Sequence, residues 1–260
     1  MRLDHIYTGD CLAILPEAIE RGSIDLIYAD PPYNLSGRKL ELRDNTTGGP
    51  FRKMNEQWDT FTGQAYLDFT RAWIQACQAV LKENGGMYVS CSYHNIGEII
   101  TCARESHLQL NNILTWCKSN AMPNLTRRTF THATEYICWF VAGRGWVFNY
   151  EEIKKLHPHR TKSGAPKQMR DFLDFIELPL VQGRERLHGD DGRALHPTQK
   201  PETLLELIIT ASSRRGDTVL DPFFGTGTTG VVAARLDRHW IGIEKDAGYA
   251  DAAARRIAAG

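Results

Sequence analysis

The sequence predicts an α/β fold organised around a doubly wound, mostly parallel sheet. Short segments rich in β-branched and aromatic residues alternate with helix-like segments over most of the chain, as such folds require. Near the end, a strand, a glycine-rich turn, a helix, a second strand and an acidic residue follow one another. With 260 residues the chain can bury a sizeable core, so we expect one domain over residues 1–260.

The predicted strands are short apolar runs bounded by glycine, proline or polar residues. They lie at 6–10, 24–30, 87–91, 113–117, 135–141, 218–220 and 239–244. The predicted helices, of which the second shows the clearest helical periodicity, lie at 11–20, 61–81, 96–106, 201–211, 229–236 and from 247 onwards. Asn84-Gly85-Gly86 ends the second helix, and Pro201 suits the first turn of the fourth.

The composition is that of an ordinary globular protein. Lys and Arg together number 31, as do Asp and Glu, so any electrostatic argument for a nucleic-acid partner has to be local. No apolar run approaches the ~18 residues of a membrane span, and residues 1–4 begin no signal peptide. We therefore expect a cytoplasmic protein with no membrane partner. The 6 cysteines form no Cys-x-x-Cys pair and the histidines lack ligand spacing, so no metal is expected.

An aspartate, two prolines and a tyrosine close the buried strand predicted at 24–30. In Asp30-Pro31-Pro32-Tyr33, hereafter the DPPY segment, neither proline can donate a backbone hydrogen bond, and each biases the preceding residue towards extended geometry. A carboxylate, carbonyl groups and an aromatic ring are therefore presented together at the carboxyl end of a strand. An ordinary strand-terminating turn uses the same residues, and this alternative stays open from the segment alone.

A second candidate site lies at 221–229, hereafter the glycine turn, between a predicted strand and a predicted helix. Gly225 and Gly227 allow the backbone to approach a ligand closely, which indicates a nucleotide-type cofactor. The turn is not a phosphate loop, because the Gly-x-x-x-x-Gly-Lys-Ser/Thr pattern is missing. Glu244 ends the next predicted strand, where its carboxylate can accept hydrogen bonds from ribose hydroxyls. A purely structural turn is the competing interpretation.

Three motifs in a fixed order resemble a known family. They are the DPPY segment, His196-Pro197-Thr198-Gln199-Lys200-Pro201 and Asp221-Pro222-Phe223-Phe224-Gly225-Thr226-Gly227-Thr228-Thr229. Together they resemble the S-adenosylmethionine-dependent DNA amino-methyltransferases, and the order, with the catalytic motif before the cofactor motif, is similar to that family's β class. The resemblance covers essentially the whole chain. It implies a seven-stranded Rossmann-like methyltransferase sheet with inserted DNA-recognition loops at 34–57, 118–132 and 151–195.

The resemblance also implies roles for individual residues. Asp221 and the backbone from 223 to 227 would contact the methionine part of S-adenosylmethionine, Glu244 its ribose and Asp10 its adenine ring. Thr198 and Lys200 would hold the methionine carboxylate, with a capped, solvated helix start as the alternative. The predicted cofactor residues are Asp10, Thr198, Lys200, Asp221, Phe223, Phe224, Gly225, Thr226, Gly227, Thr228 and Glu244, and the predicted catalytic residues are Asp30, Pro31, Pro32 and Tyr33.

The DPPY segment suits methyl transfer to an exocyclic amine, whose lone pair is delocalised into the base. If the Asp30 carboxylate and the Pro31 carbonyl each accept one amine hydrogen, the lone pair becomes available to the methyl group. Tyr33 would stack on a base flipped out of the duplex. The chain has no Pro-Cys dipeptide, which argues against carbon-5 cytosine methylation. Adenine N6 is the expected target, because aspartate at the first motif position is commonest among the family's adenine enzymes, and cytosine N4 is the alternative.

Three polar stretches are expected to contact double-stranded DNA. Those at 118–132 and 154–170 carry basic residues and no acid, and that at 34–57 carries more basic than acidic residues. The predicted DNA contacts, with the two asparagines as readers of base edges, are Arg38, Lys39, Lys118, Asn120, Asn124, Arg127, Arg128, Lys154, Lys155, Arg160 and Lys162. A solvated charged face is the competing interpretation of each stretch.

Other functions remain open from the sequence. One is methylation of an RNA or protein amide nitrogen, which the long basic insertions do not favour. Another is a catalytically silent DNA- or cofactor-binding regulator, which would be expected to have lost the DPPY segment or the glycine turn, and both are intact. The resemblance further implies a homodimer and a cognate restriction endonuclease as partners, although no sequence feature demonstrates either.

Overall fold

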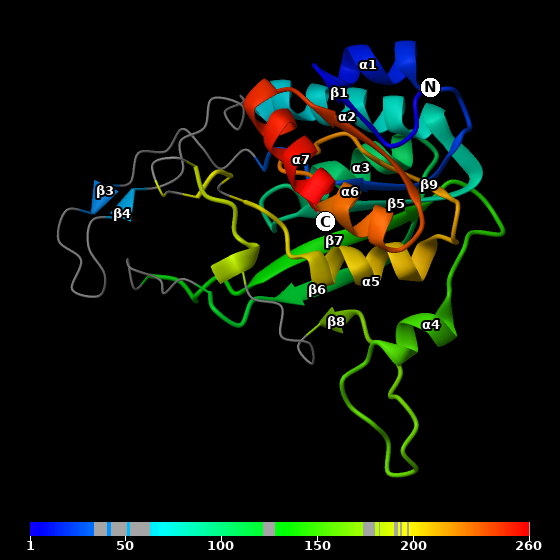
Figure 1. The fold of residues 1–260 in the computed structure, drawn as a ribbon, viewed down its shortest axis with the longest axis vertical. Helices are drawn as coiled ribbons and strands as arrows, with labels where there is room; N and C mark the ends of the chain where they lie inside the picture. Colours follow the sequence, from blue (N-terminus) through cyan, green and yellow to red (C-terminus); the bar gives the residue numbers. More distant parts are fainter. Residues whose placement is uncertain are drawn as a thin grey trace.

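The structure, a computed structural model, describes residues 1–33, 41–42, 51–52, 63–121, 128–173, 180–181, 183–189, 192, 194–196 and 198–259. Its centre is an eight-stranded sheet in the order β1-β10-β9-β2-β5-β7-β6-β8 (Figure 1). These strands are β1 (His5–Thr8), β2 (Ile24–Ala29), β5 (Leu81–Cys91), β6 (Gln109–Cys117), β7 (Thr134–Val141), β8 (Phe172–Leu173), β9 (Thr218–Asp221) and β10 (His239–Glu244). A separate antiparallel pair, β3 (Glu41–Leu42) and β4 (Phe51–Arg52), lies within the stretch predicted as a long loop.

The predicted doubly wound, mostly parallel sheet is confirmed. Among the described strands of this sheet, only β7 runs against its neighbours, pairing antiparallel with both β5 and β6. The prediction had seven strands, and the eighth is β8, which pairs parallel with β6 at the edge. A two-residue strand shows no alternation of apolar and polar residues, so the sequence gives no signal for it.

Helices cover both faces of the sheet. On one face lie α1 (Cys11–Ala18), α2 (Gly63–Val80) and α3 (Ile96–Glu105), and on the other lie α4 (Tyr150–Lys155), α5 (Glu202–Ser212), α6 (Thr228–Arg235) and α7 (Ala247–Ala259). A short 3₁₀ turn, η2 (Gly183–Glu185), precedes α5. Side chains that alternate along β2 enter the two cores in turn: Ile27 faces α1 to α3, whereas Leu26 and Tyr28 face the other helices.

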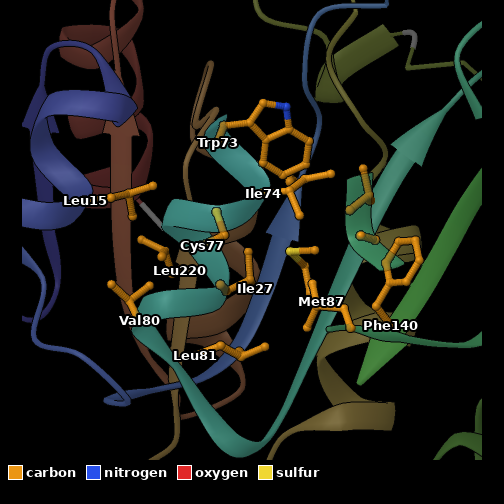
Figure 2. Close-up of a cluster of buried hydrophobic side chains, with 14 of the residues drawn as sticks. Leu15, Ile27, Trp73, Ile74, Cys77, Val80, Leu81, Met87, Phe140 and Leu220 are labelled. Carbon is orange, nitrogen blue, oxygen red and sulfur yellow. The ribbon is translucent and has the colours of Figure 1, made fainter. Parts of the chain in front are cut away.

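The apolar side chains that recur at helical spacing along α2 pack into the core. Its residues Trp73, Ile74 and Cys77 are fully buried and point towards the strands that carry Ile27 and Met87 (Figure 2). Burying an aliphatic or aromatic side chain of this size contributes ~1.5–3 kcal/mol. The helix predicted at 61–81 is therefore confirmed by the core it forms, with its last residue at Val80.

Two local differences from the prediction have physical causes. Asn84-Gly85-Gly86, expected as a helix stop, lies inside β5, where the register with β2 shifts between Ile24 and Leu26. Glycines are typical of such irregular places in a strand. The unpredicted helix α4 is only 6 residues long, too short to show periodicity.

The topology places the two candidate motifs side by side. Strand β9 pairs with β2 through Leu26–Val219 and Ile27–Leu220. From β2 the sheet extends through β5 in one direction and through β9 in the other, so the strand order reverses here. The carboxyl ends of both strands lie at this reversal, where open α/β sheets bind their ligands.

Three further observations concern membrane spans, cysteines and metal ligands. Within the described ranges, no helix is long and apolar enough to cross a membrane. All six cysteines are free thiols, and five of them are buried. Across the part of the chain that the structure describes, no group of His, Cys, Asp and Glu side chains could hold a metal ion.

Gly242 in β10 lies against the ring of Phe224 in the glycine turn. A Cβ at position 242 would lie 2.4 Å from ring carbons of Phe224. We predict that Gly242→Ala lowers the free energy of unfolding by ~1–3 kcal/mol through overpacking, measured by denaturant unfolding. Gly97→Ala, whose Cβ would meet no atom within 4 Å, is the control and should be neutral or slightly stabilising. Equal stability of Gly242→Ala and the wild type would contradict this packing.

Candidate active site

A cavity of about 710 Å³ opens where the carboxyl ends of β2 and β9 meet. This volume lies in the range of small-molecule sites. The predicted residues that line it are Asp10, Asp30, Pro31, Pro32, Tyr33, Thr198, Lys200, Asp221, Phe223, Phe224, Gly225, Thr226, Thr228 and Glu244. The predicted catalytic and cofactor residues therefore share one cavity, with the exception of Gly227.

The DPPY segment turns its polar groups into this cavity. Strand β2 ends at Ala29, and the two prolines that follow cannot continue a sheet ladder. One oxygen of Asp30, Oδ1, accepts the Tyr33 hydroxyl at 3.0 Å. The other, Oδ2, accepts the ammonium of Lys200 at 2.8 Å. Both oxygens of the predicted catalytic carboxylate thus accept hydrogen bonds from side chains that line the cavity.

Four charged side chains form a largely buried cluster around Asp30. Glu135 at the start of β7 lies 3.2 Å from Lys118 Nζ and 3.7 Å from Lys200 Nζ. Its Oε2 also accepts the Tyr33 hydroxyl at 3.4 Å. Two lysines and two carboxylates balance each other, which is necessary because an unpaired buried charge costs several kcal/mol. The cluster joins β2, the end of β6, the start of β7 and the segment before α5.

Lys200 and Glu135 each stabilise the charged form of the other. Burial alone would lower the pKa of Lys200, but the carboxylates of Asp30 and Glu135 outweigh it and raise that pKa above its ordinary value. Burial would likewise raise the pKa of Glu135, but Lys200 and Lys118 outweigh it and lower that pKa. Lys200 and Glu135 are therefore both charged at neutral pH.

A second polar network holds the backbone of the DPPY segment. The hydroxyl of Tyr66 in α2 donates to the carbonyl oxygen of Pro32 at 3.0 Å. The same hydroxyl accepts the side-chain amide of Asn95 at 2.7 Å, and Asn95 in turn accepts the backbone N–H of Ser92 at 2.8 Å. Tyr66 and Asn95 are both buried, so these bonds are shielded from water. The turn after β5 and helix α2 thereby fix the position of the Pro32 backbone.

The glycine turn is anchored by its two phenylalanines. Phe223 packs edge-on against Trp73 in one core, with ring centroids 5.3 Å apart, and Phe224 stacks on Trp240 in the other, with centroids 5.5 Å apart. Gly225 and Gly227 have φ of +52° and +79°, a conformation that favours glycine. Gly227 does not line the cavity but adjoins Ala253 of α7, where a Cβ would lie 2.8 Å from the alanine Cβ. The turn consequently presents backbone and small side chains to the cavity.

Two carboxylates frame this turn, Asp221, which is buried, and Glu244, which is partly buried. Asp221 accepts the Thr229 hydroxyl at 2.6 Å and the backbone N–H of Phe223 at 2.9 Å. Burial raises the pKa of Asp221 to about 7, although both hydrogen bonds work in the other direction. Glu244 accepts the backbone N–H of Gly225 at 2.7 Å, and burial raises its pKa as well. A cationic or hydroxyl-bearing ligand would compensate both groups.

The remaining predicted cofactor residues lie at the rim. Asp10 caps α1 through Leu12 and pairs with Lys245, whose ammonium is 3.1 Å away. The backbone N–H of Thr198 donates to Nδ1 of His196 at 3.3 Å. Burial lowers the pKa of His196 to about 4, so its imidazole is neutral at pH 7.

The structure places two of the predicted DNA contacts differently from expectation. The ammonium of Lys118 is held by Glu135, and its side chain is only 13% exposed. The side-chain amide of Asn120 bonds the backbone of Leu180 at both ends, at 2.8 and 3.3 Å. Both polar groups are therefore engaged by protein partners in this conformation, Lys118 by Glu135 and Asn120 by the Leu180 backbone.

The other predicted DNA contacts are divided between the surface and undescribed segments. Lys154 and Lys155 on α4 lie 3.7 and 2.6 Å from Glu151 and Glu152, so their charges are locally balanced. The exposed residues are Arg128, and Arg160 and Lys162 on a hairpin closed by the bridge between Arg160 and Pro166. The predictions outside the described residues are Arg38, Lys39, Asn124 and Arg127.

Three residues of the site were not singled out from the sequence: Glu135, Tyr66 and His196. Glu135 is an isolated acid at the start of an apolar strand, a pattern that also suits an exposed strand end. Tyr66 falls within the helix predicted at 61–81, and only its hydroxyl distinguishes it from a packing residue. His196 begins the motif that contains Thr198 and Lys200, so its position in the cavity could have been inferred from that motif.

Comparisons with known proteins agree with this geometry. A family model described as DNA methylase, covering N6 and N4 methyltransferases, matches residues 24–255. The chain belongs to this DNA methylase family. Type II methyltransferase M.HinfI of Haemophilus influenzae is 38% identical over 258 residues, 98% of this chain and 68% of the relative. Type II methyltransferase M2.MboI of Moraxella bovis is 35% identical over 256 residues, 97% of this chain and 86% of the relative.

Solved structures place the DNA methylase among S-adenosylmethionine-binding folds. The complex of M1.HpyAVI with S-adenosylmethionine matches with a TM-score of 0.68 and 27% identity, covering 97% of this chain and 98% of that one. PvuII DNA methyltransferase, described as cytosine-N4-specific, matches with a TM-score of 0.71 over 97% of this chain and 85% of its own, and at 21% identity this likeness concerns the fold alone.

The DNA methylase is therefore a site-specific, S-adenosylmethionine-dependent enzyme of the N6-adenine and N4-cytosine family. The residues present fit this cofactor. The cavity is large enough for a nucleoside with an amino-acid tail, and the glycine turn supplies a backbone cradle with the carboxylates of Asp221 and Glu244 beside it.

Tyr66 offers a test of how the DPPY segment is held. We predict that Tyr66→Phe lowers the free energy of unfolding by ~1–3 kcal/mol, because the buried Pro32 carbonyl and Asn95 amide lose their partner. We also predict a lower kcat for methyl transfer with little change in KM for S-adenosylmethionine. Tyr88→Phe is the control, since it removes a buried hydroxyl bonded to Ser212 at 2.7 Å, outside the cavity, and should change stability without changing kcat. An equal kcat for Tyr66→Phe and Tyr88→Phe would contradict a positioning role.

Proposed function

We propose that the chain transfers a methyl group from S-adenosylmethionine to the exocyclic N6 of adenine in a base flipped out of duplex DNA. The observation that supports this most is that the DPPY segment and the glycine turn face the same cavity from adjacent strands. A cofactor on the turn and a base against the DPPY segment would then meet directly. Aligning two bound reactants in this way can supply much of the rate without a covalent intermediate.

Asp30 and Pro31 are the proposed acceptors for the target amine. An exocyclic amine is a poor nucleophile, because its lone pair is shared with the ring. A carboxylate oxygen of Asp30 and the carbonyl oxygen of Pro31 would each accept one amine hydrogen, which directs the lone pair towards the methyl group. The Tyr33 hydroxyl, now on Asp30 Oδ1, would give way to the amine. The Tyr33 ring would stack on the flipped base, a contact worth ~1–3 kcal/mol.

The cofactor is proposed to lie along the glycine turn with its methionine end towards Asp221. That carboxylate would pair with the methionine ammonium, Glu244 would accept from the ribose hydroxyls, and Asp10 would face the adenine ring. Thr198 lies at the cavity wall, in reach of the methionine carboxylate. Lys200 could serve the same carboxylate only by moving its ammonium away from Asp30, which it now contacts at 2.8 Å.

Adenine is preferred over cytosine on the basis of the aspartate at position 30, the residue commonest there in the family's adenine enzymes. Cytosine N4 is the second candidate, because Asp30 and Pro31 would serve either amine. The cytosine-N4-specific description of PvuII methyltransferase supports the same fold for that reaction.

The protein is proposed to act as one catalytic domain over 1–260, with duplex DNA against the insertions at 34–57, 118–132 and 151–195. Arg128, Arg160 and Lys162 are exposed and available for phosphate contacts. Since two relatives are named type II methyltransferases, we also propose that a restriction endonuclease recognises the same DNA sequence. A homodimer is proposed from the habit of the class alone.

The reaction is tested by incubating unmethylated duplex DNA with tritiated S-adenosylmethionine and digesting the product to nucleosides. We predict label in N6-methyl-2′-deoxyadenosine, and that Asp30→Ala reduces transfer at least ~100-fold while cofactor affinity stays nearly unchanged. Label in N4-methyl-2′-deoxycytidine would select the second candidate. DNA binding without transfer would indicate a regulator, and unchanged transfer by Asp30→Ala would exclude the mechanism.

The role of Asp221 is tested by measuring the protons released when the cofactor binds. Its pKa of about 7 leaves the carboxyl partly protonated near neutrality, and a methionine ammonium would lower that pKa. We predict that cofactor binding releases roughly half a proton at pH 7 and that affinity falls as the pH drops from 8 to 6. Calorimetry in buffers of different ionisation enthalpy measures the release, and Asp221→Asn should abolish it. The same release by Asp221→Asn would assign the proton to another group.

A further inference from the structure

We propose that Lys200 recognises the ring nitrogen next to the target amine, N1 of adenine or N3 of cytosine, by donating a hydrogen bond to it. This inference rests on the proposed function and deepens it, because it gives the site a means of selecting which bases can be methylated. Lys200 would then contact the target base and not the methionine carboxylate of the cofactor.

The position of the ammonium carries the proposal. Nζ of Lys200 lies 2.8 Å from Asp30 Oδ2 and 5.2 Å from the centre of the Tyr33 ring, so it stands beside both groups proposed to hold the base. The Lys200 side chain is 8% exposed and lines the cavity. An ammonium has three donors; Asp30 takes one and Glu135, 3.7 Å away, attracts a second, which leaves the third for a base. The site therefore pairs a carboxylate acceptor with an adjacent donor.

This pair matches one edge of two bases. Adenine presents the N6 amine beside the N1 acceptor, and cytosine presents the N4 amine beside the N3 acceptor. A side-chain amide reads a neighbouring donor and acceptor of adenine through its own adjacent oxygen and nitrogen. Asp30 and Lys200 offer the same order of acceptor and donor, because the carboxylate that holds Nζ on Oδ2 at 2.8 Å would receive the amine on its other oxygen, Oδ1. The amine would meet Asp30 while the ring nitrogen meets Lys200.

The same pair rejects the other two bases. On that edge guanine and thymine carry a carbonyl oxygen beside a ring N–H, which is the reverse order. Their oxygen would face the Asp30 carboxylate and their N–H would face an ammonium, leaving buried groups unsatisfied. The Asp30–Lys200 pair thus admits adenine and cytosine alike, which agrees with one fold serving N6 and N4 chemistry.

Glu135 and Lys118 keep this donor in place. Glu135 lies 3.7 Å from Lys200 Nζ, and Lys118 balances the charge of Glu135 at 3.2 Å. When a base amine takes over one oxygen of Asp30, Glu135 still attracts the ammonium. Lys118 forms its ion pair with Glu135 and not with Asp30, which makes it a matched control for removing one buried lysine from the cluster.

The test uses a duplex containing the DNA sequence that the full chain methylates, with the target adenine either natural or replaced by 1-deazaadenine, which has carbon in place of N1. For a cytosine target, 3-deazacytosine replaces it. Single-turnover rates at saturating S-adenosylmethionine are compared for the wild type, Lys200→Met and Lys118→Met. For the wild type and Lys118→Met, we expect the single-turnover rate to be on the order of tenfold to a hundredfold lower on the deaza duplex than on the natural duplex. Lys200→Met should show a natural-to-deaza ratio near one.

A natural-to-deaza ratio in Lys200→Met equal to that of the wild type would overturn the proposal. A raised KM for S-adenosylmethionine with that unchanged ratio would instead assign Lys200 to the methionine carboxylate. Circular dichroism checks folding, and Lys200→Arg, which keeps a charged donor, should retain the wild-type ratio. If Lys200→Met does not fold, a wild-type enzyme that shows no loss on the deaza base overturns the proposal by itself. Absence of transfer to the natural duplex would be a failure of the proposed function, seen before any base is exchanged.

Discussion

The buried ion pair between Lys200 and Asp30 is the interaction on which the site depends. It joins the segment before α5 to the end of β2, two parts of the chain far apart in sequence, with both side chains at most 14% exposed. Charges at this depth have to be compensated, so the second carboxylate, Glu135, and the second lysine, Lys118, follow from the first pair. The ends of four elements are thereby drawn to one point at the carboxyl edge of the sheet.

The sheet makes that convergence possible. Because β9 pairs with β2, the glycine turn and the DPPY segment lie next to each other at the carboxyl ends of these two strands. Phe223 and Phe224 then fix the turn to both cores, while Tyr66 fixes the Pro32 carbonyl from helix α2. The segments that line the cavity are held by packing on both faces of the sheet, which fixes the positions of their polar atoms.

Much of this could be predicted from the sequence because it depends on local signals. Prolines and glycines define the two motifs, apolar periodicity defines α2, and the order of strands and helices defines the parallel sheet. Glu135 could not be found in this way, since its role depends on β7 inserting antiparallel between β5 and β6. Lys118 was expected on a DNA-facing surface for the same reason: its partner is supplied by the neighbouring strand, 17 residues away.

The central claim is that the Asp30 carboxylate and the Pro31 carbonyl receive the amine of a flipped base opposite the cofactor. The most direct measurement is a crystal structure of the chain with S-adenosylhomocysteine and a duplex carrying its recognised sequence. The account predicts the target base in the cavity, with its exocyclic nitrogen within ~3.2 Å of both acceptors and the cofactor sulfur on the glycine-turn side. A base bound with its amine turned away from Asp30, or a duplex bound with every base still stacked, would contradict it.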